Sequence, residues 1–311
     1  MVGDARKIEQ ELAAIEEKVT TIAEEFRDLY AKYLEQLGQV TQRQLILASY
    51  EICTRNYPES FIKLPYSQRE KLQQDLQNLG KKFQGQLLEC LDISVEEEEL
   101  EALESQLDAF AIAREMLEQH DNVQPFPGHE IFLAEDSELD SEEDSEEEEE
   151  LPSNPEELVD WHRAVEGAIA RRIEAISKEA NSLLQQVGIL PNKIPPQLLD
   201  IAMQAEETAE LGVGKPNLLN LLVETEEKDH EEDNTPSPRP PAQVARIVAI
   251  RLRLPEIEFA DTPLSMTRKQ IRDFLSKISS IRKQYIQKRR EKTIAEAEAA
   301  WRSSWYENNE Q

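Results

Sequence analysis

The chain has 311 residues, of which 32% are charged and 6% aromatic, and it carries a formal net charge of -29. A charge this negative excludes binding of nucleic acid or anionic membranes by the chain as a whole, so such binding would need a local basic patch. The 39% of apolar residues are too many for full disorder, yet aromatic residues are too scarce for one large core. The composition therefore predicts a mainly α protein made of small helical units with disordered links between them.

Composition shifts divide the chain into five predicted parts. They are a helical hairpin or coiled-coil bundle over residues 1–120, an acidic disordered linker over 121–153, a second helical unit over 154–224, a disordered acidic and proline-rich linker over 225–241, and a segment over 242–311 that ends in a long basic helix. A soluble helical protein with two flexible joints is the expected architecture.

The most regular pattern lies in residues 4–37, where two apolar series repeat every seven positions. This seam predicts a helix about 50 Å long that pairs with one or two partners, in the same chain or in a second copy. Gly38 is expected to end the helix. The predicted partner-binding residues of the seam are Leu12, Ile15, Val19, Ile22, Phe26, Leu29 and Tyr33.

Three further helices are predicted before the acidic linker. Apolar spacing indicates helices over residues 41–55 and 67–91, and Ser94 with Glu97 forms a capping box for a helix that continues to about His120. Helices with matched apolar stripes favour an antiparallel bundle or a long hairpin with a short cap.

The linker contains an acidic run over residues 135–150, in which twelve of the sixteen residues are Asp or Glu. Such a run buries too little apolar surface to offset the entropy of ordering, which predicts a solvated tether. Two other roles stay open: contact with the basic helix of the same chain, and mimicry of a nucleic acid toward basic proteins.

The second half begins with a strong helix signal. Asn154 is a predicted N-cap, Pro155 occupies the first helical position, and Gly188 ends the helix. The apolar positions repeat at eleven and not at seven residues, so the two halves are expected to be separate units.

Secondary structure is less certain in the stretch that follows. Short helices are predicted over residues 197–211 and 217–223, the latter within a dense leucine cluster. Residues 242–254 fit strand alternation nearly as well as helical spacing, and flanking prolines favour the helix.

The last predicted helix runs from Thr262 or Ser265 to about Trp305 and has a local charge of +8 over residues 268–292. The alternatives are binding of a polyanion such as RNA, DNA or anionic lipid, and pairing with the chain's own acidic residues. Trp301 and Trp305 are predicted partner anchors, or else they pack on the chain itself. The candidate polyanion-binding residues are Arg268, Lys269, Arg272, Arg282, Lys283, Lys288, Arg289, Arg290 and Lys292.

No motif indicates catalysis, a cofactor or a metal site, because the four histidines lie in different segments and no carboxylate pair is recognisable. Two cysteines, no apolar leader and no long apolar run favour a cytoplasmic protein with no transmembrane segment. The sequence therefore predicts a non-enzymatic scaffold or adaptor that binds other proteins, with self-association through residues 4–37. The alternative is an acidic regulator whose basic helix binds a polyanion.

Overall fold

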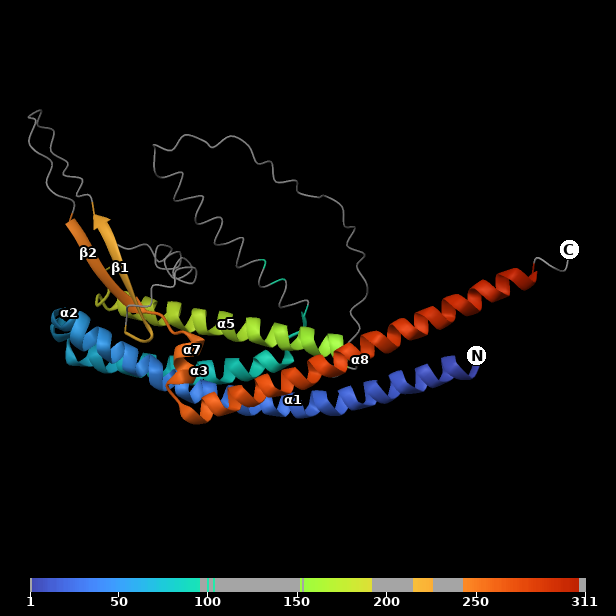
Figure 1. The fold of residues 1–311 in the computed structure, drawn as a ribbon. Coiled ribbons are helices and arrows are strands. Elements are labelled where there is room, and N and C mark those ends of the chain that lie inside the picture. The colour runs from blue at the N-terminus through green and yellow to red at the C-terminus, as the bar shows by residue number, and fades with distance from the viewer. Residues whose placement is uncertain are drawn as a thin grey trace, which may run out of the picture.

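The protein is mainly α, as predicted, in a computed structural model that describes residues 2–95, 100, 103, 152, 154–191, 215–225 and 243–307. Its frame is a bundle of four long helices, in which each helix packs against two neighbours in the ring α1–α3–α5–α8 (Figure 1). These are α1 (Val2–Glu51), α3 (Tyr66–Glu89), α5 (Pro155–Gln186) and α8 (Thr262–Glu307).

Shorter elements complete the described structure: η1 (Ile52–Asn56), α2 (Pro58–Lys63), η2 (Cys90–Asp92), β1 (Leu218–Thr225), β2 (Gln243–Ile250) and α7 (Leu254–Phe259). The predicted acidic linker, the predicted helix over residues 197–211 and nearly all of the predicted helix after Ser94 lie outside the described residues.

The first helix is longer than predicted, because α1 continues through Gly38 to Glu51. Gly38 allows close packing against α3: a Cβ atom placed there would lie 2.9 Å from Gln84 Cγ. Gly80 of α3 plays the same part toward Gln42, and the two glutamine side chains are joined by a 3.0 Å hydrogen bond. The glycine is therefore a packing residue within the helix and not its end.

Both predicted ends of α5 are confirmed. The Asn154 side chain accepts hydrogen bonds from the backbone of Glu156 and Glu157, and Glu157 completes a capping box. At the other end Gly188 has a positive φ of 76°, and the backbone N–H of Ile189 donates to Leu184 O. This Schellman turn carries the chain out of the helix.

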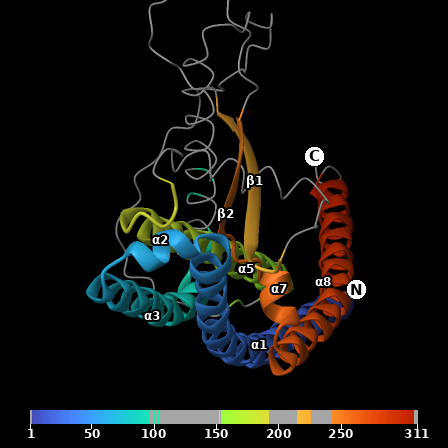
Figure 2. The ribbon, with the colours of Figure 1, turned by 90° about the vertical axis from the view of Figure 1, so that its left-hand side faces the viewer.

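The helices predicted over residues 217–223 and 242–254 are wrong, since both stretches form strands of an antiparallel pair (Figure 2). The register pairs Leu218 with Ile250. Side chains outside the strand pair form hydrogen bonds with backbone groups on the outer edge of β2. Asn181 of α5 donates to Ile250 O and accepts from Ile250 N, both at 2.8 Å, and Tyr57 accepts from Val248 N. These contacts outweigh the helix propensity of the leucines.

Residues from both sides of the predicted acidic linker contribute to one core. Phe26 of α1 stacks on Phe274 of α8 at 5.3 Å and meets Trp161 of α5 edge to face. The helices α1 and α8 run antiparallel well beyond the start of α5, where Lys288 and Lys292 bind Glu11 and Glu9. The described body is therefore elongated, with both described ends of the chain on one side (Figure 1).

Candidate functional site

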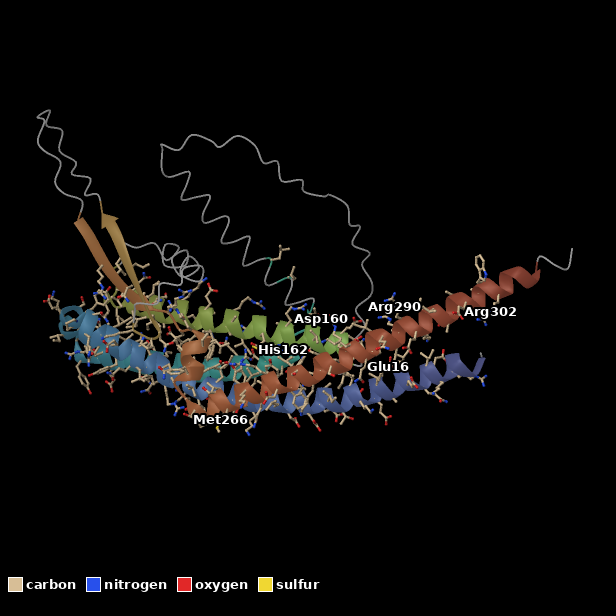
Figure 3. All side chains as sticks on the ribbon, viewed as in Figure 1. Glu16, Asp160, His162, Met266, Arg290 and Arg302 are labelled. Carbon is tan, nitrogen blue, oxygen red and sulfur yellow. The ribbon has the colours of Figure 1, made fainter. Side chains whose placement is uncertain are left out.

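The main concentration of polar side chains in the described core lies where α1, α5, α7 and α8 meet. We call it the core polar cluster, and it consists of Tyr30, Tyr33, His162, Glu166, Glu258 and Arg268. Figure 3 shows the labelled His162 between the helices. The tyrosines come from neighbouring turns of α1, and His162 and Glu166 are one turn apart on α5. The helices α1 and α5 therefore present two polar groups each to the same point, and α7 and α8 present one each.

Arg268 organises the core polar cluster. Its guanidinium forms a two-pronged ion pair with Glu166, in which Nη2 donates to Oε2 at 2.6 Å, and its Nε lies 3.1 Å from Glu258 Oε1. The same guanidinium covers the ring of Tyr33 at 5.5 Å. A single cation therefore joins α8 to α5, α7 and α1.

The tyrosine hydroxyls fill the remaining positions around the two carboxylates. Tyr33 donates to Glu258 at 2.6 Å, and Tyr30 donates to Glu166 at 2.5 Å. His162 Nδ1 lies 2.6 Å from the same Tyr30 oxygen. Because the tyrosine proton points at the carboxylate, Nδ1 must carry the hydrogen that His162 donates to Tyr30.

The surroundings of the core polar cluster fix its charges. Burial would raise the pKa of Glu166, but the hydrogen bonds and charge of Arg268 outweigh it and lower that pKa. Burial lowers the pKa of His162, although Glu166 opposes the effect. Burial and then Glu166 raise the pKa of Tyr30 above its usual range. At neutral pH Arg268 is thus paired with an ionised Glu166, next to a neutral imidazole.

The side chains of the core polar cluster form hydrogen bonds and ion pairs with one another, and this limits the reactions that they could catalyse. Both oxygens of Glu166 accept hydrogen bonds, and Arg268 lowers its affinity for a proton, which opposes a role as a general base. The arrangement is suited to holding four helices in one register.

The seam predicted on α1 faces the chain's own helices. Four of its residues, Leu12, Val19, Phe26 and Tyr33, are buried, and Ile15, Ile22 and Leu29 pack partly buried against the same core. The seam is therefore occupied by contacts within one chain. Trp301, by contrast, is 67% exposed, and Trp305 lies on the last turns of α8.

Most of the predicted polyanion-binding residues lie beside carboxylates of the chain itself. Arg282 and Arg289 flank Glu156 of α5, Lys288 and Lys292 reach α1, and Arg272 lies 4.0 Å from Glu258. With Arg268, six of the nine are within ion-pair distance of a described carboxylate. The other three, Lys269, Lys283 and Arg290, are exposed on α8.

Large exposed apolar side chains lie at both ends of the elongated body, and others, among them Phe259 and Met266, lie on α7 and the first turns of α8. At the end formed by α1, α2 and α3 they are Leu47, Tyr50, Ile62 and Tyr66, which we call the α1–α3 end patch. On the part of α8 that extends toward the C-terminus they are Ile286, Ile294 and Trp301, which we call the α8 stripe. Exposed groups of this size mark candidate contact surfaces for other proteins.

A cavity of about 310 Å³ lies between the end of α3 and α5, beside Cys90 and Arg172. Burial raises the pKa of Cys90 to about 11, which leaves a protonated and unreactive thiol. Over the described ranges, no group of three His, Cys, Asp or Glu side chains could hold a metal ion. The helices described have no stretch of sufficient length and apolarity to cross a membrane.

Sequence reasoning identified Arg268 only as one cation among many and missed its partners. The signal was present, because Arg268 interrupts the apolar stripe that holds Leu264 and Ile271 of the last helix. An ionic residue on a core-facing stripe requires a buried counter-charge. The positions of Glu166 and Glu258 give no comparable signal among so many carboxylates.

Comparison with known proteins adds no relative: no family model matches the chain, and neither the curated proteins nor the solved structures give a significant match.

Proposed function

We propose that this chain is a non-enzymatic adaptor that binds other proteins through the two ends of a stiff helical body. The observation that carries the proposal is the presence of exposed apolar groups at both ends of the body, in the α1–α3 end patch and the α8 stripe. The 50-residue helix α1 spans about 75 Å at 1.5 Å per residue, so contacts at the two ends would be held well apart.

The composition of the two surfaces supports protein contacts. Tyrosine, tryptophan, leucine and isoleucine provide large apolar area, and the first two dominate binding energy at protein interfaces. The body between them is held by the core polar cluster and by the Gly38–Gly80 crossing. An adaptor requires a rigid body with a protein-binding surface at each end.

The test compares proteins cross-linked to the tagged full chain in its own cell with those cross-linked to surface variants. Leu47→Glu is expected to remove one set of neighbours and Trp301→Glu a different set, since each places a charge in an apolar contact. Lys81→Glu, on an exposed position of α3 away from both surfaces, is the control. An identical set of neighbours for all four proteins would overturn the adaptor proposal.

The polyanion alternative has weaker support, because six of its nine residues have carboxylate neighbours in the chain. Three exposed cations, Lys269, Lys283 and Arg290, predict only weak binding with a shallow salt dependence. Titration of the full chain with RNA, DNA and anionic vesicles at low salt tests this. Tight binding that is lost in the triple Lys269→Gln, Lys283→Gln, Arg290→Gln variant would favour the regulator over the adaptor.

A further inference from the structure

The α8 stripe carries an ordered sequence of charges around an exposed apolar residue. Ile294, which is 51% exposed, lies at its centre. The exposed cation Arg290 lies one turn before Ile294, and the carboxylate Glu298 lies one turn after it. In Figure 3 the labelled Arg290 points away from α1, so this face does not take part in the α1–α8 pairing.

We propose that the α8 stripe is a self-association surface on which the α8 helices of two copies of this chain pack antiparallel. The inference rests on the proposed adaptor function and names the partner at one of its two surfaces. A twofold axis near Ile294 brings the two copies of that side chain together. It also sets Arg290 of each copy against the turn of the other copy that carries Glu298 and Trp301, so every contact occurs twice.

The order of charges along the α8 stripe favours a second copy of the chain as the partner and an antiparallel packing of the two helices. In a parallel pairing each residue would meet its own copy, so Arg290 would face Arg290 and Glu298 would face Glu298, which is repulsive. The antiparallel pairing replaces these with opposite charges, and it places the guanidinium of Arg290 beside an indole ring, where cation–π attraction adds to it. Glu298 already binds Arg302 of its own helix at 2.8 Å, and it would then serve two cations.

The first measurement is the mass of the full chain by sedimentation equilibrium over a wide concentration range. Physiological salt is needed, because it limits the repulsion between two chains of charge -29 to distances of about 8 Å. We expect a monomer–dimer equilibrium that Ile294→Glu weakens by about tenfold or more. Leu47→Glu, at a similarly exposed position but at the opposite end, should leave the equilibrium unchanged.

Charge exchange is the sharper test. Arg290→Glu and Glu298→Arg should each weaken the dimer, since each creates two repulsive contacts across the axis. The variant with both substitutions should restore the dimer. Each contact between positions 290 and 298 across the axis then joins opposite charges again, with the positive and negative positions exchanged. Circular dichroism of each variant checks that the helices are retained. A double variant no stronger than the single ones would overturn the antiparallel arrangement.

The outcomes also separate this inference from the adaptor proposal. A chain that stays monomeric at all concentrations, or a dimer that Ile294→Glu leaves intact, overturns self-association through α8. If the monomeric chain still loses cross-linked neighbours in Trp301→Glu, the adaptor proposal survives and the stripe binds a different protein. If the chain dimerises as described but no variant changes its neighbours, the adaptor proposal fails alone.

Discussion

At the scale of single residues, Arg268 makes more connections between helices than any other side chain described in the core polar cluster. Only 17% of its side chain is exposed, and hydrogen bonds to Glu166 raise its pKa above the usual range even though burial opposes this. The charge is therefore permanent. Two carboxylates from α5 and α7 remain partly buried because this cation is present.

Replacing Arg268 with Met should destabilise the protein by about 3–5 kcal/mol, because Glu166 and Glu258 lose their counter-charge while the volume is kept. Urea unfolding followed by circular dichroism measures the change. The control is Arg302→Met, which breaks the exposed pair with Glu298 and should cost less than about 1 kcal/mol. Equal effects of the two substitutions would contradict the role given to the cluster.

The cluster also predicts a loss of stability in acid. Burial lowers the pKa of His162 below 6.5, so the unfolded chain takes up a proton there before the folded chain does, and stability falls as the pH falls below 6.5. The lowered pKa of Glu166 adds a second loss below pH 4.5, as the pH falls through the pKa of the folded state. His162→Gln should flatten the first part of the curve and leave the second. A wild-type stability that rises on acidification would refute this.

Sequence alone could recognise the charges of this cluster but not their pairing. The chain has 64 acidic residues, and nothing local marks Glu166 or Glu258 as the two that meet Arg268. The partners lie 102 and 10 positions from Arg268 and become neighbours only when α5 and α7 pack on α8. Such contacts are a property of the tertiary fold.

At the scale of elements, two glycines inside helices, Gly38 and Gly85, predict opposite effects for the same substitution. Gly38→Ala should destabilise, because the new Cβ atom would lie 3.2 Å from the backbone of Gln84, and moving α3 costs more than the roughly 1 kcal/mol gained in helix propensity. Gly85→Ala meets no atom within 4 Å and should stabilise by about 0.5–1 kcal/mol. Thermal unfolding of both variants checks the signs, and stabilisation by both would show that the crossing is loose.

The elements themselves were predicted well where the signal is local. Asn154 and Gly188 mark the ends of α5 correctly, since caps act within a turn of the chain. The strands were mistaken for helices because their stability comes from elsewhere. Asn181 and Tyr57 bind the backbone of β2 across 69 and 191 positions of sequence, and Ser177 accepts from Leu252 N, just past β2, across 75 positions.

At the scale of the whole molecule, the two cysteines report on the integrity of the bundle. Cys53 and Cys90 are buried, and burial raises the pKa of each thiol to about 11. The native chain should therefore resist alkylation near neutral pH, and labelling should rise with denaturant along the same curve as the loss of helix. Rapid labelling of either cysteine before helix is lost would reveal local opening of α1 or of the α3 end.

The mainly α class and the α1 seam followed from periodicity, but the choice of partner did not. A four-heptad seam fits a second copy as well as it fits a helix of the same chain. Here its buried residues face helices that begin as late as Thr262, and the heptads contain nothing that identifies those helices. The coiled-coil and scaffold predictions therefore remain to be tested in solution.

The pairing of α1 with α8 affects the timing of biosynthesis. Glu16 meets Tyr285, and Gln36 meets Thr267, so the first helix made is completed by the last. At roughly 5–20 residues per second, a ribosome takes on the order of tens of seconds to reach the last helix after finishing the first. Throughout that interval the part of the apolar face of α1 that α8 covers lacks its native partner, which makes the nascent chain a substrate for chaperones that hold exposed amphipathic helices.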